Sequence, residues 1–147
     1  MGTDLTDVFW ARHANPKSGW SRVATLPLLV YAILHREWRL FALVLAFTAV
    51  NPLLFPPPKT DDAWMTTVVL AERYWRETEA DVGVLSLLNV VNVPVTLYAL
   101  YAAYRRNVGG ATVATALSMT LKFAFVAGLV RRFGDDLGDL EPSIDAE

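Results

Sequence analysis

The stretch that decides the fold is VGVLSLLNVVNVPVTLYALYAAY, residues 82–104, which contains no charged side chain. A helix needs about 20 predominantly apolar residues to cross the hydrocarbon core of a bilayer, and this stretch is long enough. A surface helix of a soluble bundle shows a polar face at helical spacing, whereas the polar members of this stretch are Ser86, Asn89, Asn92 and Thr96. The stretch therefore predicts a transmembrane helix.

Further apolar stretches lie on both sides of this one. Residues 107–130 are interrupted by one charge, Lys122, and residues 40–58 carry no charge and end in three consecutive prolines. Each is long enough for a span.

A shorter apolar stretch, residues 23–34, is bracketed by Trp20 and Trp38. Tryptophans are enriched at both membrane–water interfaces, so this bracket is typical of a span. Arg22 and Arg36 lie between these two tryptophans. The segment therefore crosses the bilayer only if both arginine side chains extend toward the headgroups.

The predicted fold class is all-α, a four-helix transmembrane bundle of two hairpins with interfacial amphipathic helices. Apolar residues make up 54% of the chain and charged residues 19%, against roughly 45–50% and about 25% in soluble domains. A soluble bundle of buried helices is the alternative, which the long uncharged runs disfavour. We expect a single integral membrane domain over residues 1–147. Its spans are expected at 20–38, 39–55, 83–104 and 109–130, with an interfacial helix at 61–78 and an acidic tail at 133–147.

The topology follows from the basic residues, because cytoplasmic loops carry an excess of Lys and Arg. If the N-terminus is cytoplasmic, the outer turns hold Arg36, Arg39, Arg105 and Arg106. The inner segments then hold Arg12, Lys17, Arg22, Lys59, Arg73, Arg76, Arg131 and Arg132. The larger inner group predicts a multi-pass protein of the cell membrane with both termini in the cytoplasm.

Composition limits the chemistry that the chain can perform. Cysteine is absent, which excludes a disulfide scaffold, thiolate metal ligation and a cysteine nucleophile. His13 and His35 are the only histidines, so a multi-histidine metal site is not expected. We expect no cofactor, no metal and no nucleic-acid partner. The slightly acidic, lysine-poor composition suits a halophilic microbe, in which high salt screens surface charge.

One candidate cluster lies within the membrane around Lys122. A charge near the centre of a span costs roughly 2.5–3.5 kcal/mol on insertion scales, which makes it a candidate for function. If the second hairpin turns near Asn107, Asn92 lies level with Lys122 and Asn89 lies about one helical turn deeper. Two interpretations stay open for Lys122, Asn92 and Asn89: interhelical packing, which we favour, and an ion or proton pathway.

A second candidate cluster lies at the inner interface, where the first span begins and the second ends. Its members are His13, Asn15, Lys17, Arg22, Asn51, Lys59, Asp61 and Asp62, with Glu72 as an additional candidate. A capping and ion-pair network that closes the bundle is the interpretation we favour. The alternative is a site for anionic lipid headgroups, with Arg and Lys facing phosphate.

The two longest strings of that cluster carry a family resemblance. HANPKSGWSR at 13–22 and NPLLFPPPK at 51–59, with WM at 64–65 and ERYW at 72–75, resemble an uncharacterised family of small multi-pass membrane proteins from archaea and bacteria. The patterns are H-x-N-P-x-S-x-W-[ST]-R and N-P-x-x-F-P-P-P-K, and the resemblance covers roughly residues 5–130. It implies an integral membrane protein of haloarchaeal origin and assigns no activity and no catalytic residue.

The expected function is that of a structural or accessory membrane protein that acts through oligomerisation or a membrane partner. An oligomeric pore or transporter lined by Lys122 and Asn92 is one alternative. An interfacial enzyme or a binder of anionic headgroups is another. Because no motif of a hydrolase, kinase, P-loop or metalloprotease is present, we name no catalytic residue and favour a non-enzymatic role.

Overall fold

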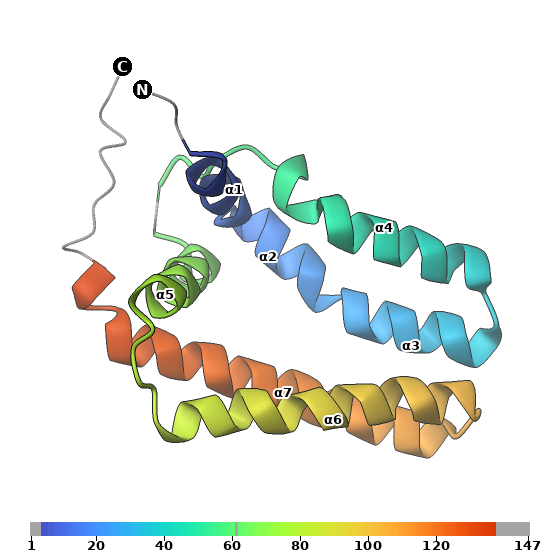
Figure 1. Ribbon diagram of the computed structural model, residues 1–147. Helices are drawn as coiled ribbons and strands as arrows, with labels where there is room; N and C mark the ends of the chain where they lie inside the picture. The colour runs from blue at the N-terminus through green and yellow to red at the C-terminus, as the bar shows by residue number, and fades with distance from the viewer. Residues whose placement is uncertain (1–3, 61, 138–147) are drawn as a thin grey trace.

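The computed structural model describes residues 4–60 and 62–137, and this part of the chain is helical with no strand. The all-α class predicted from the sequence is thereby confirmed. Seven helices follow one another in the described ranges (Figure 1). They are α1 Leu5–His13, α2 Pro16–Val23, α3 Thr25–His35, α4 Trp38–Leu54, α5 Trp64–Thr78, α6 Val84–Tyr104 and α7 Val108–Phe133.

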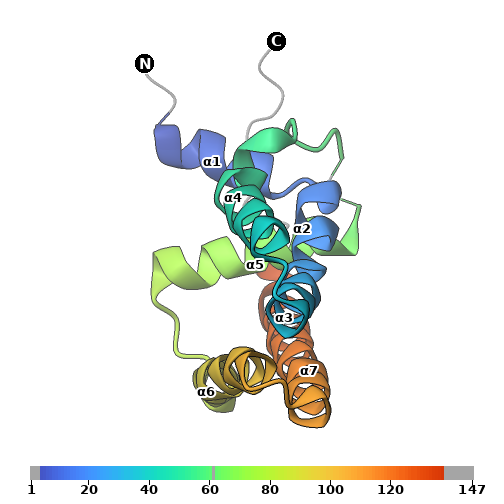
Figure 2. The same cartoon turned by 90° about the vertical axis from the view of Figure 1, so that its right-hand side faces the viewer.

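The helices form two hairpins and an end cap. Helices α3 and α4 make one hairpin and α6 and α7 the other, and α3 packs between α4 on one side and α6 and α7 on the other. Helices α1 and α5 cross the hairpins at the end opposite to the two hairpin turns, as Figures 1 and 2 show. The arrangement places α1, α5 and the end of α7 together at one end of the molecule.

The expected first span, 20–38, is divided into two helices. Helix α2 ends at Val23 and α3 begins at Thr25, with Pro27 in the first turn of α3. Proline has no N–H to donate to the carbonyl four residues back, and its ring crowds that carbonyl. The Leu28 amide restores the pattern by donating to the Ala24 carbonyl at 3.1 Å. The expectation of one continuous helix is therefore wrong at Ala24.

Small residues allow α6 and α7 to pack closely near their turn. Buried alanines from both helices meet there: Ala99, Ala102, Ala103, Ala111 and Ala114. Near the other end of this hairpin, a Cβ on Gly128 would lie 2.4 Å from the Leu85 Cδ2 atom. Small side chains at such positions let helix backbones approach one another.

Helix α5 is amphipathic and packs against α2 and α7 through one face. That face contributes Met65, Val68 and Ala71 to a core with Phe125 and Leu129 of α7. The residue before the first turn of α5 is Ala63, and no side chain caps this helix. Asp61 lies outside the described residues.

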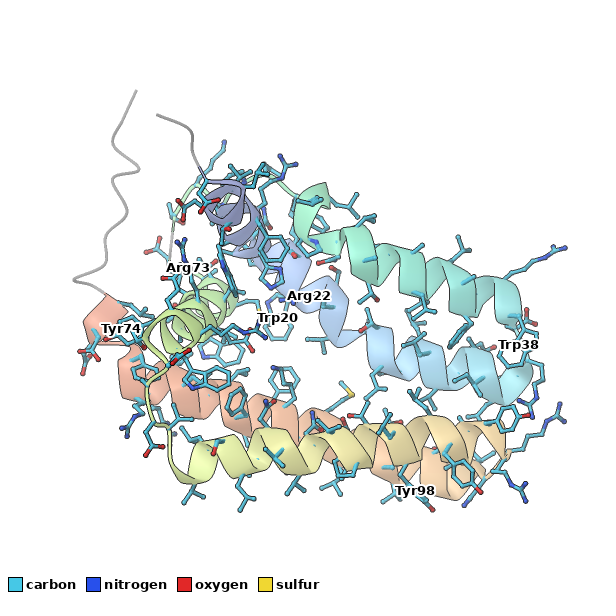
Figure 3. The ribbon with its side chains drawn as sticks, viewed as in Figure 1. Trp20, Arg22, Trp38, Arg73, Tyr74 and Tyr98 are labelled. Carbon is cyan, nitrogen blue, oxygen red and sulfur yellow. The ribbon has the colours of Figure 1, made fainter. Side chains whose placement is uncertain are left out.

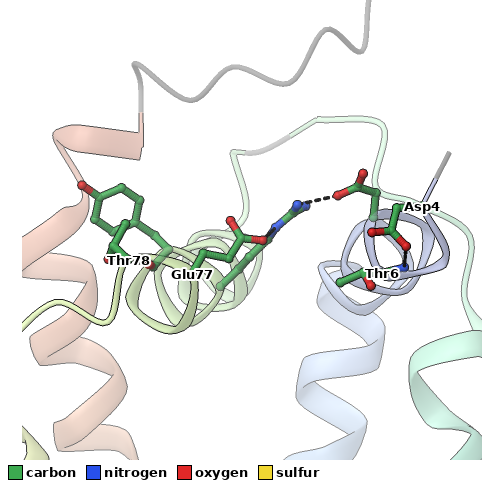
Figure 4. Close-up of polar contacts among 7 residues, drawn as sticks. Asp4, Thr6, Glu77 and Thr78 are labelled. Carbon is green, nitrogen blue, oxygen red and sulfur yellow. Dashed lines mark hydrogen bonds and ion pairs between the residues drawn. The ribbon is translucent and has the colours of Figure 1, made fainter. Parts of the chain in front are cut away.

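One ion pair and one hydrogen bond attach α5 to the N-terminal segment. Arg73 donates to Asp7 of α1 at 2.6 Å and to Glu77 of its own helix at 2.7 Å (Figure 4). The Thr66 hydroxyl, which is buried, donates to the Ala14 carbonyl at 2.9 Å. Both contacts hold α1 and α5 together as the cap of the bundle.

Two of the described helices, α6 and α7, are long and apolar enough to cross a membrane. Helix α4 is also apolar but shorter. Of the residues in the apolar part of α6, only 6% are fully buried, against 33% in α7. The predicted acidic tail falls mostly outside the described residues, which end at Leu137.

Candidate functional site

A chamber of about 310 Å³ lies where α2, α5, α6 and α7 meet. Trp20 and Arg22 extend from α2 into this region (Figure 3). Its polar lining comes from all four helices: Arg22, Glu72, Asn92, Thr96, Ser118 and Lys122. Its apolar lining includes Val23, Leu26, Val68, Met119, Phe123 and Val126.

Three charged side chains face the chamber, two cationic and one anionic. The Lys122 Nζ donates to the Glu72 Oε1 at 2.8 Å, and the Glu72 side chain is 17% exposed while that of Lys122 is 48% exposed. The Arg22 Nε is buried and has no hydrogen-bond partner among the described residues. The charged groups of the lining therefore sum to one positive charge.

Neutral polar groups complete the wall. The Asn92 Oδ1 is a buried acceptor without a partner among the described residues. The hydroxyls of Thr96 and Ser118 bond to each other at 2.7 Å across α6 and α7. Because buried polar atoms are normally paired, the Asn92 and Arg22 atoms leave hydrogen-bonding capacity in the wall of this chamber for a ligand or water.

Three aromatic rings lie beside the chamber. Trp20, Trp64 and Phe123 come from α2, α5 and α7, and their centroids are 6.2–6.3 Å apart. Both tryptophans are partly exposed, at 53% and 39%. Amphipathic rings of this kind favour the boundary between an apolar medium and water.

The structure brings Lys122 and Asn92 of the predicted intramembrane cluster into one chamber. Asn89 is half-buried on α6 and is not among the chamber residues. Glu72 is the partner of Lys122 that sequence reasoning missed, since it lies in the expected interfacial helix and not in an expected span. The hydrophobic periodicity of α5 predicted that this helix lies against the bundle. The same periodicity did not indicate which residue of α7 would contact Glu72.

Part of the predicted inner-interface cluster is a structural network between α2 and α4. Asn51, fully buried, accepts a hydrogen bond from the Ser18 hydroxyl at 2.6 Å and donates to the Ser21 hydroxyl at 2.8 Å. Asn15 caps α2 by accepting from the Lys17 amide and donates to the Pro56 carbonyl at 2.8 Å. Ser18 is buried and links α2 to α4 through this bond to Asn51.

His13 lies buried at the end of α1 and stacks on Phe9 with ring centroids 5.2 Å apart. Its burial, reinforced by the positive charges of Arg22 and Arg76 and opposed by Glu72, lowers the pKa of His13 to about 4. The imidazole is therefore neutral at neutral pH.

The remaining predicted members of this cluster do not join it. Lys17, Lys59 and Asp62 are exposed, and Asp61 lies outside the described residues. The structure thus separates the predicted cluster into Asn51, which bonds to Ser18 and Ser21, the helix cap Asn15, the buried His13, the chamber residue Arg22 and an exposed remainder. In the described part of the chain, no group of three or more His, Cys, Asp or Glu side chains could hold a metal ion.

A second hollow lies at the far end of the second hairpin. It measures about 550 Å³, and its lining is almost wholly apolar: Pro94, Val95, Tyr98, Gly109, Gly110, Val113, Ala114 and Leu117. Because its lining contains no charged side chain, this hollow offers apolar contacts but few polar ones.

Comparison with known proteins places the chain in a family. Searches of the curated proteins and of the solved structures each returned no match. A family model described as a family of unknown function (DUF6653) matches residues 3–126, a range that includes every chamber residue. The chain therefore belongs to this family of unknown function, DUF6653.

Proposed function

We propose that this chain is a multi-pass integral membrane protein of accessory type that works from within the bilayer. The observation that carries the proposal is the apolar and largely exposed face of α6: only 6% of the residues in its apolar part are fully buried within the molecule, and Leu87, Val90, Val93 and Leu97 are exposed. Leaving such a surface in water costs roughly 25 cal/mol per Å². Lipid, a second copy of the chain or a membrane partner would cover it.

The positions of the aromatic residues support an orientation across the membrane. Trp38, Tyr101 and Tyr104 are exposed around the hairpin turns, whereas Trp20 and Trp64 lie near the cap. Helix α6 has 21 residues, which at 1.5 Å per residue gives about 32 Å, close to the roughly 30 Å of the hydrocarbon core. Aromatic residues therefore lie where the two membrane interfaces would be.

In this proposal the two hairpins are the four predicted spans and the α1–α5 cap lies at the cytoplasmic face. Helices α2 and α3 together form the first span, and Arg22 lies near its inner end. The excess of Lys and Arg at the cap favours this orientation over the reverse.

For a chain that spans the membrane in this way, an accessory role has more support than transport through a pore. Lys122, proposed above as a pore-lining residue, is paired with Glu72 of the same chain. The chamber of about 310 Å³ is small for a transport cavity within one protomer. The proposed function is to hold a polar chamber at the inner membrane interface, where a lipid or partner protein can reach it.

The membrane proposal can be tested by labelling single cysteines, because the natural chain contains none. Arg105→Cys places a thiol in an outer turn, and Lys59→Cys places one at the cap; both positions are exposed. In intact cells, a membrane-impermeant maleimide should label only Arg105→Cys. Lys59→Cys should react only after permeabilisation.

Fractionation provides the control for this experiment. The wild-type chain should stay with the membrane pellet after washing at alkaline pH and dissolve only in detergent. Release into the wash, or equal labelling of both positions in intact cells, would contradict the proposal.

A further inference from the structure

The charges of the chamber favour an anionic ligand. Arg22 and Lys122 contribute two positive charges against the single carboxylate of Glu72, so a monoanion would make the site neutral. The Arg22 Nε, buried without a partner in the described part of the chain, is a donor ready for such a group. Guanidinium groups bind phosphate and carboxylate oxygens with two parallel hydrogen bonds.

The rest of the lining narrows the ligand to an amphiphile with a hydroxyl group. The buried Asn92 Oδ1 can only accept, so it requires a donor such as a hydroxyl. Val23, Met119 and Phe123 supply apolar contacts on the remaining wall. A volume of about 310 Å³ is near the lower end of small-molecule sites, roughly 300–1,000 Å³, and suits a headgroup better than a whole lipid.

We infer that the chamber binds a monoanionic phosphate ester that carries a hydroxyl group, as in the headgroup of a glycerol phospholipid. The phosphate oxygens accept from Arg22 and Lys122, and the hydroxyl donates to Asn92. In the free protein Glu72 pairs with Lys122, and this ion pair breaks when the phosphate binds. The lipid source of this ligand rests on the proposed position of the chamber at the inner membrane interface.

The same chemistry could come from a soluble phosphate ester, so the experiment has two arms. In the first, the full chain in detergent is incubated with phosphatidylglycerol or with phosphatidylcholine, and native mass spectrometry measures the retained lipid. In the second, free glycerol phosphate competes with phosphatidylglycerol. We expect retention of phosphatidylglycerol over phosphatidylcholine, and little competition from the soluble ester because it lacks the apolar chains.

Variants distinguish a ligand site from a structural ion pair. A hydrogen bond to a charged group contributes about 1.5–3 kcal/mol, so Arg22→Gln and Lys122→Met should each lower retention by about tenfold or more. Lys122→Arg keeps the charge and should restore most of it. Glu72→Gln removes the competitor for Lys122 and should raise retention, which a purely structural pair would not do. The matched control is Arg131→Gln, which changes an exposed arginine on α7, the helix that carries Lys122. It should leave retention unchanged.

The outcomes separate this inference from the membrane proposal. Equal retention in the wild type, Arg22→Gln and Lys122→Met would overturn the ligand site while leaving the labelling result intact. Lower retention in Glu72→Gln would overturn it as well, because the ion pair would then be structural. Strong competition by glycerol phosphate would support the phosphate site and assign its ligand to a soluble ester. Melting temperatures in detergent confirm that each variant is folded.

Discussion

At the scale of single residues, the buried amide of Asn51 links α2 to α4. Replacing Asn51 with Ala removes the acceptor of the buried Ser18 hydroxyl and the amide that donates to Ser21, and opens a small cavity. We expect a loss of about 2–4 kcal/mol of unfolding free energy. Denaturation of the detergent-solubilised protein measures it.

The matched control for this variant is Thr48→Val on the same helix. The Thr48 hydroxyl donates only to the Val44 carbonyl of its own helix, at 2.7 Å. Its loss should change the unfolding free energy by less than about 0.5 kcal/mol. An Asn51→Ala variant as stable as Thr48→Val would show that the α2–α4 network contributes little.

His13 predicts how stability depends on pH. The pKa of His13 is lowered from 6.5 to about 4 in the folded protein by burial and by the positive charge of Arg22. Between these values the unfolded chain binds the proton and the folded chain does not, so unfolding free energy falls as the pH drops from about 6.5 to about 4. The melting temperature of the wild type should therefore be lower at pH 5 than at pH 7.5.

A variant isolates the contribution of this imidazole from those of the carboxylates. In His13→Asn the melting temperature should fall less between pH 7.5 and pH 5 than in the wild type. His35→Asn, which changes the exposed histidine, should retain the wild-type dependence. An identical pH response in the wild type and His13→Asn would contradict the burial of a neutral imidazole.

At the scale of helices, the contact between α2 and α5 depends on a missing side chain. A Cβ on Gly19 would lie 2.1 Å from the Met65 Cγ and 2.6 Å from its Sδ. Gly19→Ala should therefore push the helices apart and cost about 1–3 kcal/mol through overpacking. Because the clash is with one side chain, adding Met65→Ala should recover part of the loss, and a double-mutant cycle of melting curves measures this coupling. Additive losses would place the strain elsewhere.

Sequence patterns predicted the positions of the helices better than the contacts between them. The expected segments at 39–55 and 83–104 differ by at most one residue at each end from α4 and α6, since charged residues or the prolines at 56–58 bound each segment. The break at Ala24 was missed because Pro27 is tolerated in a first turn, and the sequence does not say which turn it occupies. The pairing of Glu72 with Lys122 depends on how α5 docks, which periodicity does not encode.

The same limit applies to the candidate site. Lys122 and Asn92 could be matched from the length of one hairpin, because both lie on helices joined by a short turn. His13, Asn15 and Asn51 could be assigned to one end of the bundle, but their division into a network and a separate buried imidazole depends on side-chain packing. Distance along the chain sets the limit: the residues that were matched lie 30 positions apart within one hairpin.

At the scale of the whole molecule, the pair of Glu72 and Lys122 has a consequence for biosynthesis. Glu72 precedes the second hairpin and Lys122 lies in its last helix, so their contact joins segments made 50 residues apart. During synthesis, the first hairpin and α5 can assemble while the chamber still lacks two of its four walls. Only the final helix supplies the lysine and closes the chamber, so this ion pair marks the completed fold.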